Sequence, residues 1–157
     1  MYFCDIIFYE GFIHFNMMTA VEKIRRFCEY QDRCEVEVRR KMAQLLVPAE
    51  ERESLMEQLK EERFVDDERF AESFIRGKVN QKRWGRVKIK VELQQRGISA
   101  SVISKMMSEM DETKYEENLR YLVGKWRSEN PGGERGKMVR HLMGKGYTAD
   151  EIFSIDK

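Results

Sequence analysis

Apolar residues recur at helical spacing along most of the chain, and the clearest run follows Asp66 and Asp67. Its members stand three and four positions apart: Phe70, Ala71, Phe74, Ile75 and Val79. This spacing predicts an amphipathic helix that ends near Asn80. The two carboxylates in front of the run can accept hydrogen bonds from the free amides of the first turn, so they predict where the helix begins.

Two further helices are predicted after this one. Gly85 interrupts the chain, and a second helix is expected over residues 86–96. Gly97 then stands where a left-handed C-terminal cap requires a residue without Cβ. Ser99 is a good N-cap for a third helix. The apolar positions of that third helix are Ile103, Met106, Met107 and Met110.

The second of these helices carries apolar residues on two sides. Ile89 and Leu93 form one stripe, which we expect to face the core of its own module. Because each residue turns the helix by about 100°, Val87 and Val91 lie about 200° away from that stripe. We therefore predict that these two valines contact other elements, such as an adjacent repeat.

A pattern of helix, turn and helix occurs three times without gaps, beginning at Val36, Val87 and Gly136. Equivalent apolar positions are Val38, Ile89 and Met138, then Met42, Leu93 and Leu142, and later Leu55, Met106 and Ile155. The turn residues are Leu46, Gly97 and Gly146, so the first repeat departs from the others here. The next helix starts at Pro48, Ser99 or Thr148. Three ungapped copies that share turn, cap and core positions indicate an internal repeat rather than a chance match.

Each repeat also has an earlier helix, so a unit of about 50 residues contains three helices. One such unit buries little apolar surface by itself, whereas units in series share interfaces. The sequence therefore predicts an all-α fold, an elongated array of three tandem three-helix modules with a short N-terminal arm. The predicted boundaries are 1–18 for the arm and 19–65, 66–112 and 113–157 for the modules.

The first sixteen residues differ from the rest of the chain because they contain no Lys or Arg. They lack the basic start of a secretory signal and are too short to span a bilayer. Two interpretations stay open: a small hairpin that turns at Glu10-Gly11, or an extension upstream of a translation start at Met17 or Met18. Thr19 and Glu22 form a capping box, so we expect ordered structure to begin there.

Charge is distributed unevenly between neighbouring modules, although the net charge is only +1. Residues 48–68 hold nine acids and three bases, whereas residues 76–96 hold eight bases and one acid, Glu92. We call residues 76–96 the basic segment. Its predicted partner-binding residues are Arg76, Lys78, Lys82, Arg83, Trp84, Arg86, Lys88, Lys90 and Arg96.

Two interpretations of the basic segment are open. The cations either coat a solvated helix face or meet an anionic partner, and their number against one acid favours the partner. Trp84 has three possible roles: to anchor an interface, to stack on a base, or to pack in the core.

The sequence offers little for catalysis or metal binding. It contains no glycine-rich phosphate loop, no zinc-protease motif, no paired Cys-x-x-Cys and no nucleophile elbow. Cys4, Cys28 and Cys34 lack metal-ligand spacing and suggest reduced thiols in the cytoplasm. Two histidines, His14 and His141, do not suffice for a convincing catalytic pair. We therefore predict no enzyme, no metal and no cofactor.

Residues 64–98 also contain an ordered motif: an Asp-Asp pair before Arg-Phe-Ala, then Phe, Gly, Ile, Glu-Leu and Gly-Ile. Its members are Asp66, Asp67, Arg69, Phe70, Ala71, Phe74, Gly85, Ile89, Glu92, Leu93, Gly97 and Ile98. The motif resembles the second repeat of the RecX family of recombinase regulators. The tandem three-helix pattern extends this resemblance over residues 19–155.

The resemblance implies a cytoplasmic regulator of the RecA recombinase that acts as a monomer in DNA repair and the SOS response and does not bind a membrane. In that family the protein lies in the helical groove of the RecA–single-stranded-DNA filament and touches neighbouring protomers. It opposes filament extension, ATP hydrolysis, strand exchange and coprotease activity. Two alternatives remain: a helical protein that binds nucleic acid directly through the second module, and a helical scaffold for some other protein.

Overall fold

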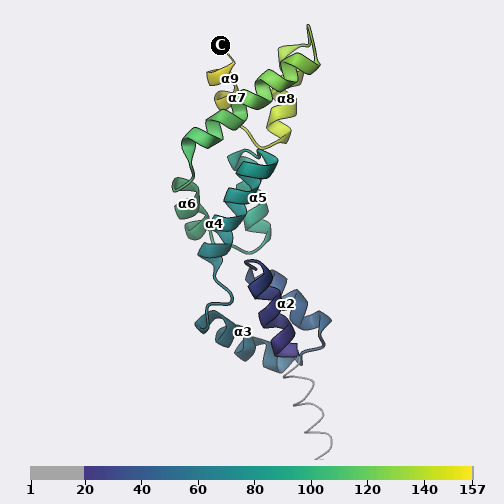
Figure 1. Cartoon of the computed structure of the whole chain (residues 1–157), viewed down its shortest axis with the longest axis vertical. Helices are drawn as coiled ribbons and strands as arrows, with labels where there is room; N and C mark the ends of the chain where they lie inside the picture. The colour runs from purple at the N-terminus through teal and green to yellow at the C-terminus, as the bar shows by residue number, and fades with distance from the viewer. Residues whose placement is uncertain (1–19, 157) are drawn as a thin grey trace, which may run out of the picture. The chain divides into compact units, whose positions relative to one another are not determined.

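The computed structural model describes residues 20–156, and every regular element in that range is a helix (Figure 1). The predicted all-α class is therefore confirmed. Expectations about residues 1–18 and the Thr19 capping box lie outside the described residues. Within the described range, no helix combines the length and the apolar character that crossing a bilayer requires.

The described residues fall into two compact units, divided between Phe70 and Ala71. The first unit contains a helix over residues 20–30, α2 (Glu35–Gln44), the short 3-10 helix η1 (Ala49–Glu51) and α3 (Arg52–Glu61). Apolar side chains from these helices form its core: Ala20, Ile24, Cys28, Val38, Met42, Val47, Leu55, Met56, Leu59 and Val65. Cys28 and Cys34 are both buried.

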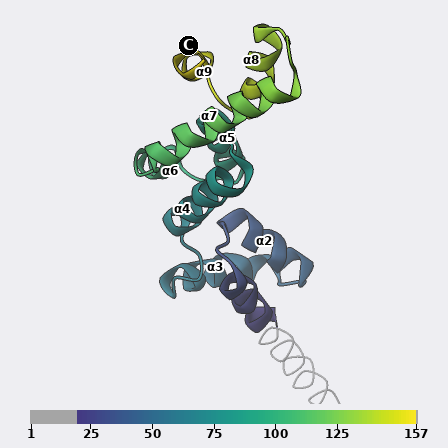
Figure 2. The same cartoon turned by 45° about the horizontal axis from the view of Figure 1, so that its top comes forward.

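The division falls within α4 (Asp67–Gly77). The second unit continues with a π-helical turn η2 (Lys78–Lys82), α5 (Arg86–Gln95), α6 (Ala100–Ser108), α7 (Glu112–Glu129), α8 (Arg135–Gly144) and α9 (Ala149–Ile155). Helices α7, α8 and α9 pack against one another (Figures 1 and 2). Their shared core is Tyr115, Leu119, Leu122, Val123, Met138, Leu142, Tyr147 and Ile152.

The turns that follow α2, α5 and α8 share one backbone conformation. Leu46, Gly97 and Gly146 all have a positive φ, of 58°, 77° and 96°. In each turn the next amide donates a hydrogen bond to a carbonyl five residues earlier: Val47 to Met42, Ile98 to Leu93 and Tyr147 to Leu142. This is the helix-ending motif for which glycine is favoured. The first repeat thus makes the same turn with a leucine, whose side chain is 84% exposed.

Several predicted helix starts are confirmed, with one correction. The Asp66 carboxylate accepts from the Arg69 amide at 3.1 Å, and Ser99 accepts from the Val102 amide. The last helix begins at Thr148 as predicted, and Thr148 and Glu151 form a capping box there. Asp67 does not act as a cap, because it is the first residue of α4, and its Oδ1 is buried without a hydrogen-bond partner among the described residues. Burial and the nearby Glu35 carboxylate raise the Asp67 pKa.

The two apolar sides of α5 differ in burial. Ile89 and Leu93 are fully buried, as their stripe predicts. Val87 and Val91 are 49% and 44% exposed. The Val87 amide donates to the Gly146 carbonyl at 3.0 Å, so the expected contact with an adjacent repeat is made by the Val87 backbone, while about half of each valine stays exposed.

Candidate partner-binding surface

The basic segment lies at the end of α4, in η2, in the loop that follows and along α5. A π-helical turn ends where Arg83 adopts a left-handed conformation, with φ of 49°. Asn118 of α7 supports this irregular backbone, since its buried side-chain amide donates to the Val79 carbonyl at 2.9 Å. The loop that carries Trp84 into α5 is therefore held in place by the third module.

Trp84 lies half-buried between two lysines. The Lys78 and Lys88 ammonium nitrogens are 4.9 and 4.5 Å from the centre of its ring. The Trp84 amide also donates to the Lys78 carbonyl at 3.2 Å. Cation–π attraction holds both ammonium groups at the ring, so Trp84 concentrates positive charge at this point of the surface.

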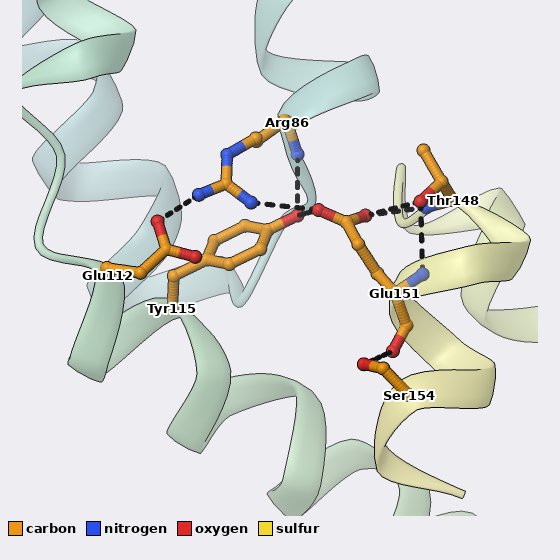
Figure 3. A network of polar contacts seen from close by, with 6 residues as sticks. All are labelled: Arg86, Glu112, Tyr115, Thr148, Glu151 and Ser154. Atoms are coloured by element: carbon orange, nitrogen blue, oxygen red, sulfur yellow. Dashed lines mark hydrogen bonds and ion pairs between the residues drawn. The ribbon is translucent and has the colours of Figure 1, made fainter.

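Arg86 takes part in a polar network that joins the second and third modules (Figure 3). Its guanidinium pairs with Glu151 at 2.8 Å and with Glu112, and it lies over the Tyr115 ring. The Arg86 amide donates to the Tyr115 hydroxyl, and that hydroxyl donates to Glu151. Figure 3 shows Glu151 between Arg86 and Thr148, whose hydroxyl and amide both donate to it. Both the guanidinium and the amide of Arg86 therefore already have partners within the chain.

The network shifts the acidity of its members. Burial raises the pKa of Glu151, but hydrogen bonds from Thr148, Arg86 and Tyr115 outweigh that effect and leave its pKa lowered. Burial raises the pKa of the Tyr115 phenol well above its ordinary value. The network therefore holds a carboxylate and a neutral phenol at neutral pH.

Three other arginines of the basic segment also have partners within the chain. Arg83 lies over the Tyr121 ring, with its guanidinium carbon 4.3 Å from the ring centre. Arg96 pairs with Glu92 at 2.6 Å and lies over Phe74. Arg76 is exposed and makes a looser pair with Glu72 at 3.7 Å.

Lys82 and Lys90 differ from these arginines because they are exposed and make no ion pair within the described residues. An anionic partner can approach them without breaking an existing contact. Of the residues predicted from the sequence, Arg76, Lys82 and Lys90 are exposed, and the other six are partly buried.

The family-motif residues have structural roles in the fold. Arg69 pairs with Asp32 at 2.6 Å and donates to the Arg63 carbonyl. Phe70 is buried, and Phe74 lies under Lys78 at 4.9 Å. Gly97 takes the positive φ that its turn requires.

The contact of Gly85 with the third module was missed from the sequence. Its amide donates to the Lys145 carbonyl at 2.9 Å, and the Val87 amide donates to the Gly146 carbonyl at 3.0 Å. With the Arg86–Tyr115 bond, these contacts satisfy the first amides of α5 from outside that helix. Buried tyrosines usually bring their hydroxyl to a partner, so Tyr115 and Tyr147 offered the available signal.

The described residues contain no group of three His, Cys, Asp or Glu side chains placed to hold a metal ion. A pocket of about 290 Å³ is lined by residues of α4, η2, α6 and α7, among them Ile75, Val79 and Met106.

Comparison with known families gives a match over residues 66–107 to the model described as RecX, second three-helix domain. These residues contain the whole basic segment.

Curated relatives carry the name Regulatory protein RecX. One from Clostridium tetani is 35% identical over 109 residues, which cover 66% of this chain and 50% of the relative. One from Clostridium acetobutylicum is 29% identical over 150 residues, covering 90% and 69%.

A relative from Salmonella paratyphi A is 29% identical and covers 86% of this chain and 88% of its own length. The chain thus spans about half the length of some relatives and most of others. The relatives' names describe a regulatory protein rather than an enzyme, in agreement with the expectation from the sequence.

Two solved structures share the fold. A structure titled as the regulatory protein RecX has a TM-score of 0.80 at 22% identity and covers 90% of this chain and 73% of that one. RecX from Lactobacillus salivarius has a TM-score of 0.78 at 21% identity, with coverage of 89% and 94%. At this identity the likeness concerns the fold.

Proposed function

Because the chain belongs to the RecX family, we propose that it is a regulator that binds the filament of the RecA recombinase on single-stranded DNA. Binding inhibits the filament's ATP hydrolysis, strand exchange and coprotease activity. The protein acts as a cytoplasmic monomer in DNA repair and the SOS response and requires no cofactor. Single-stranded DNA is contacted directly or through the filament.

One observation carries the proposal: the residues that match the family model also contain the chain's strongest concentration of positive charge. Within that segment Lys82 and Lys90 are exposed and make no ion pair in the described part of the chain. A filament groove that holds DNA phosphates and acidic side chains attracts such a surface. Charges of this kind contribute chiefly to encounter rate and register.

The tandem modules suit a repeating partner. Modules at 19–65, 66–112 and 113–157 present similar helices at successive positions along the chain, as a repeat protein does. Several weak contacts made at once to neighbouring protomers add up to firm binding, because each contact after the first is intramolecular.

The test is ATP hydrolysis by preformed RecA filaments, titrated with the full chain. We expect hydrolysis to fall as the chain is added. Binding to a bare single-stranded oligonucleotide over a range of salt concentrations is measured in parallel. A direct nucleic-acid binder predicts strong, steeply salt-dependent binding to the oligonucleotide.

Two results would contradict the proposal. In one, the filaments are neither bound nor inhibited. In the other, bare DNA and filaments are bound equally well and hydrolysis falls only when DNA is limiting, which identifies a DNA-binding protein.

A further inference from the structure

Helix α5 leaves two valine side chains about half exposed. Val87 and Val91 stand one helical turn apart on the face opposite the buried Ile89 and Leu93, and nearly half of each valine is exposed. β-Branched residues are poor helix formers, so an exposed helix position gains nothing from them in stability. Helix stability therefore does not explain their presence on the outer face.

Charge on the outer face of α5 is positive. Lys90 stands between the two valines in sequence and is exposed, while Lys88 lies on the opposite flank, against Trp84. The one acid of the helix, Glu92, is occupied by Arg96 at 2.6 Å. The strip is apolar, bordered by lysines, and has no free carboxylate on its helix. A partner surface that matches it has apolar side chains bordered by acids.

The same face differs in the other two modules. Residues equivalent to Val87 and Val91 are Val36 and Arg40 in α2, and Gly136 and Arg140 in α8. A pair of valines one turn apart therefore belongs to α5 alone among the three middle helices. Val36 is 39% exposed and provides a matched single valine elsewhere in the chain.

We propose that the outer face of α5, formed by Val87, Lys90 and Val91, docks on an acidic protein surface with an apolar centre. This inference rests on the proposed function and assigns the strip to the protein part of the filament. Nucleic acid fits the strip less well, because charged phosphates gain no favourable contact from apolar valine side chains. Bases stack on open aromatic faces, and the nearby Trp84 ring is flanked by Lys78 and Lys88.

The experiment compares the full chain with the variants Val87→Ser/Val91→Ser and Lys90→Gln, and with Val36→Ser as the matched control. Affinity is measured for preformed RecA filaments and for a bare single-stranded oligonucleotide, and the melting temperature of each variant is recorded. We expect the double valine variant to bind filaments about tenfold or more weakly, as for a central apolar contact. Its oligonucleotide binding and melting temperature stay unchanged. Lys90→Gln mainly lowers the salt dependence, and Val36→Ser binds like the parent chain.

Each contrary result has its own meaning. Unchanged filament affinity in the double variant overturns the docking strip, as does an equal loss in Val36→Ser. Weaker oligonucleotide binding shows that the strip meets DNA, and a lowered melting temperature shows that the valines pack within the chain. Either result overturns the inference. If the parent chain itself does not bind filaments, the proposed function and the inference are both rejected. If the parent chain binds and the double valine variant binds equally well, only the inference is rejected.

Discussion

Gly85 and Gly146 lie backbone against backbone where the start of α5 meets the turn after α8. A Cβ on Gly85 would lie 2.2 Å from the carbonyl carbon and oxygen of Gly146. A Cβ on Gly146 would lie 2.4 Å from the Lys88 Cβ. The second and third modules therefore join through main-chain contacts that side chains would prevent.

Replacing Gly85 with alanine should destabilise the protein. Because the new methyl group meets backbone rather than a movable side chain, the joint must open, at a cost of about 1–3 kcal/mol or more. Gly124→Ala is the control, since a Cβ there meets nothing within 4 Å, and alanine favours the α7 helix. Urea unfolding measures both. If the two variants unfold at the same urea concentration, Gly85 and Gly146 do not approach each other as closely as described.

Replacing Leu46 with glycine should stabilise the protein. Leu46 holds a left-handed conformation, and its side chain is 84% exposed, so the change removes strain and loses little buried surface. Relief of about 1–2 kcal/mol of strain, less the entropy cost of glycine, leaves a gain of about 0.5–1 kcal/mol. The reverse change Gly97→Leu should cost stability in the same unfolding assay. A loss of stability in Leu46→Gly would mean that the leucine side chain packs against something.

Glu151→Gln should weaken the protein at neutral pH and matter less in acid. The folded-state pKa of Glu151 lies below its ordinary value of 4.5, so its charged form contributes stability above that value. This contribution is lost as the pH falls through the lowered pKa. Glutamine can still accept the capping hydrogen bonds but loses the charge that pairs with Arg86, so we expect a deficit of about 1 kcal/mol at pH 7.

Unfolding free energies of Glu151→Gln and the parent chain at several pH values check this prediction. Glu116→Gln is the control, because Glu116 pairs with Arg120 on the surface of α7 and such pairs contribute little. A deficit that does not shrink between pH 4.5 and lower pH would show that the charge of Glu151 is not what stabilises the joint.

Local features of the fold could be predicted from the sequence because they depend on neighbours in the chain. Ile89 and Leu93 are buried as their spacing predicts, and Gly97 and Thr148 end and begin helices in the expected way. The turn at Leu46 shows that the repeat pattern can impose a backbone conformation even where glycine is missing.

Contacts between modules could not be predicted, because spacing within one helix carries no information about them. Arg86 looked equivalent to Lys90, four residues later, yet Arg86 pairs with Glu151 and Lys90 has no ion pair in the described chain. Gly85 looked like a simple helix break, although its main role is the close approach to Gly146. Which cations remain available to a partner therefore depends on pairing in three dimensions.

Reversal of the two unpaired lysines tests whether the basic segment carries the inhibition of the filament. Lys82→Glu/Lys90→Glu changes the charge of the basic segment without touching the Arg86 network, so folding should be unaffected. Lys23→Glu/Arg140→Glu makes the same change in net charge at two exposed positions outside the segment. The measurement is ATP hydrolysis by preformed RecA filaments, titrated with the parent chain and both variants. We expect that about tenfold more of the Lys82→Glu/Lys90→Glu variant than of the parent chain is needed for half-inhibition, while the control inhibits like the parent. Equal inhibition by all three proteins would show that the basic segment is only a solvated surface and does not contact the filament.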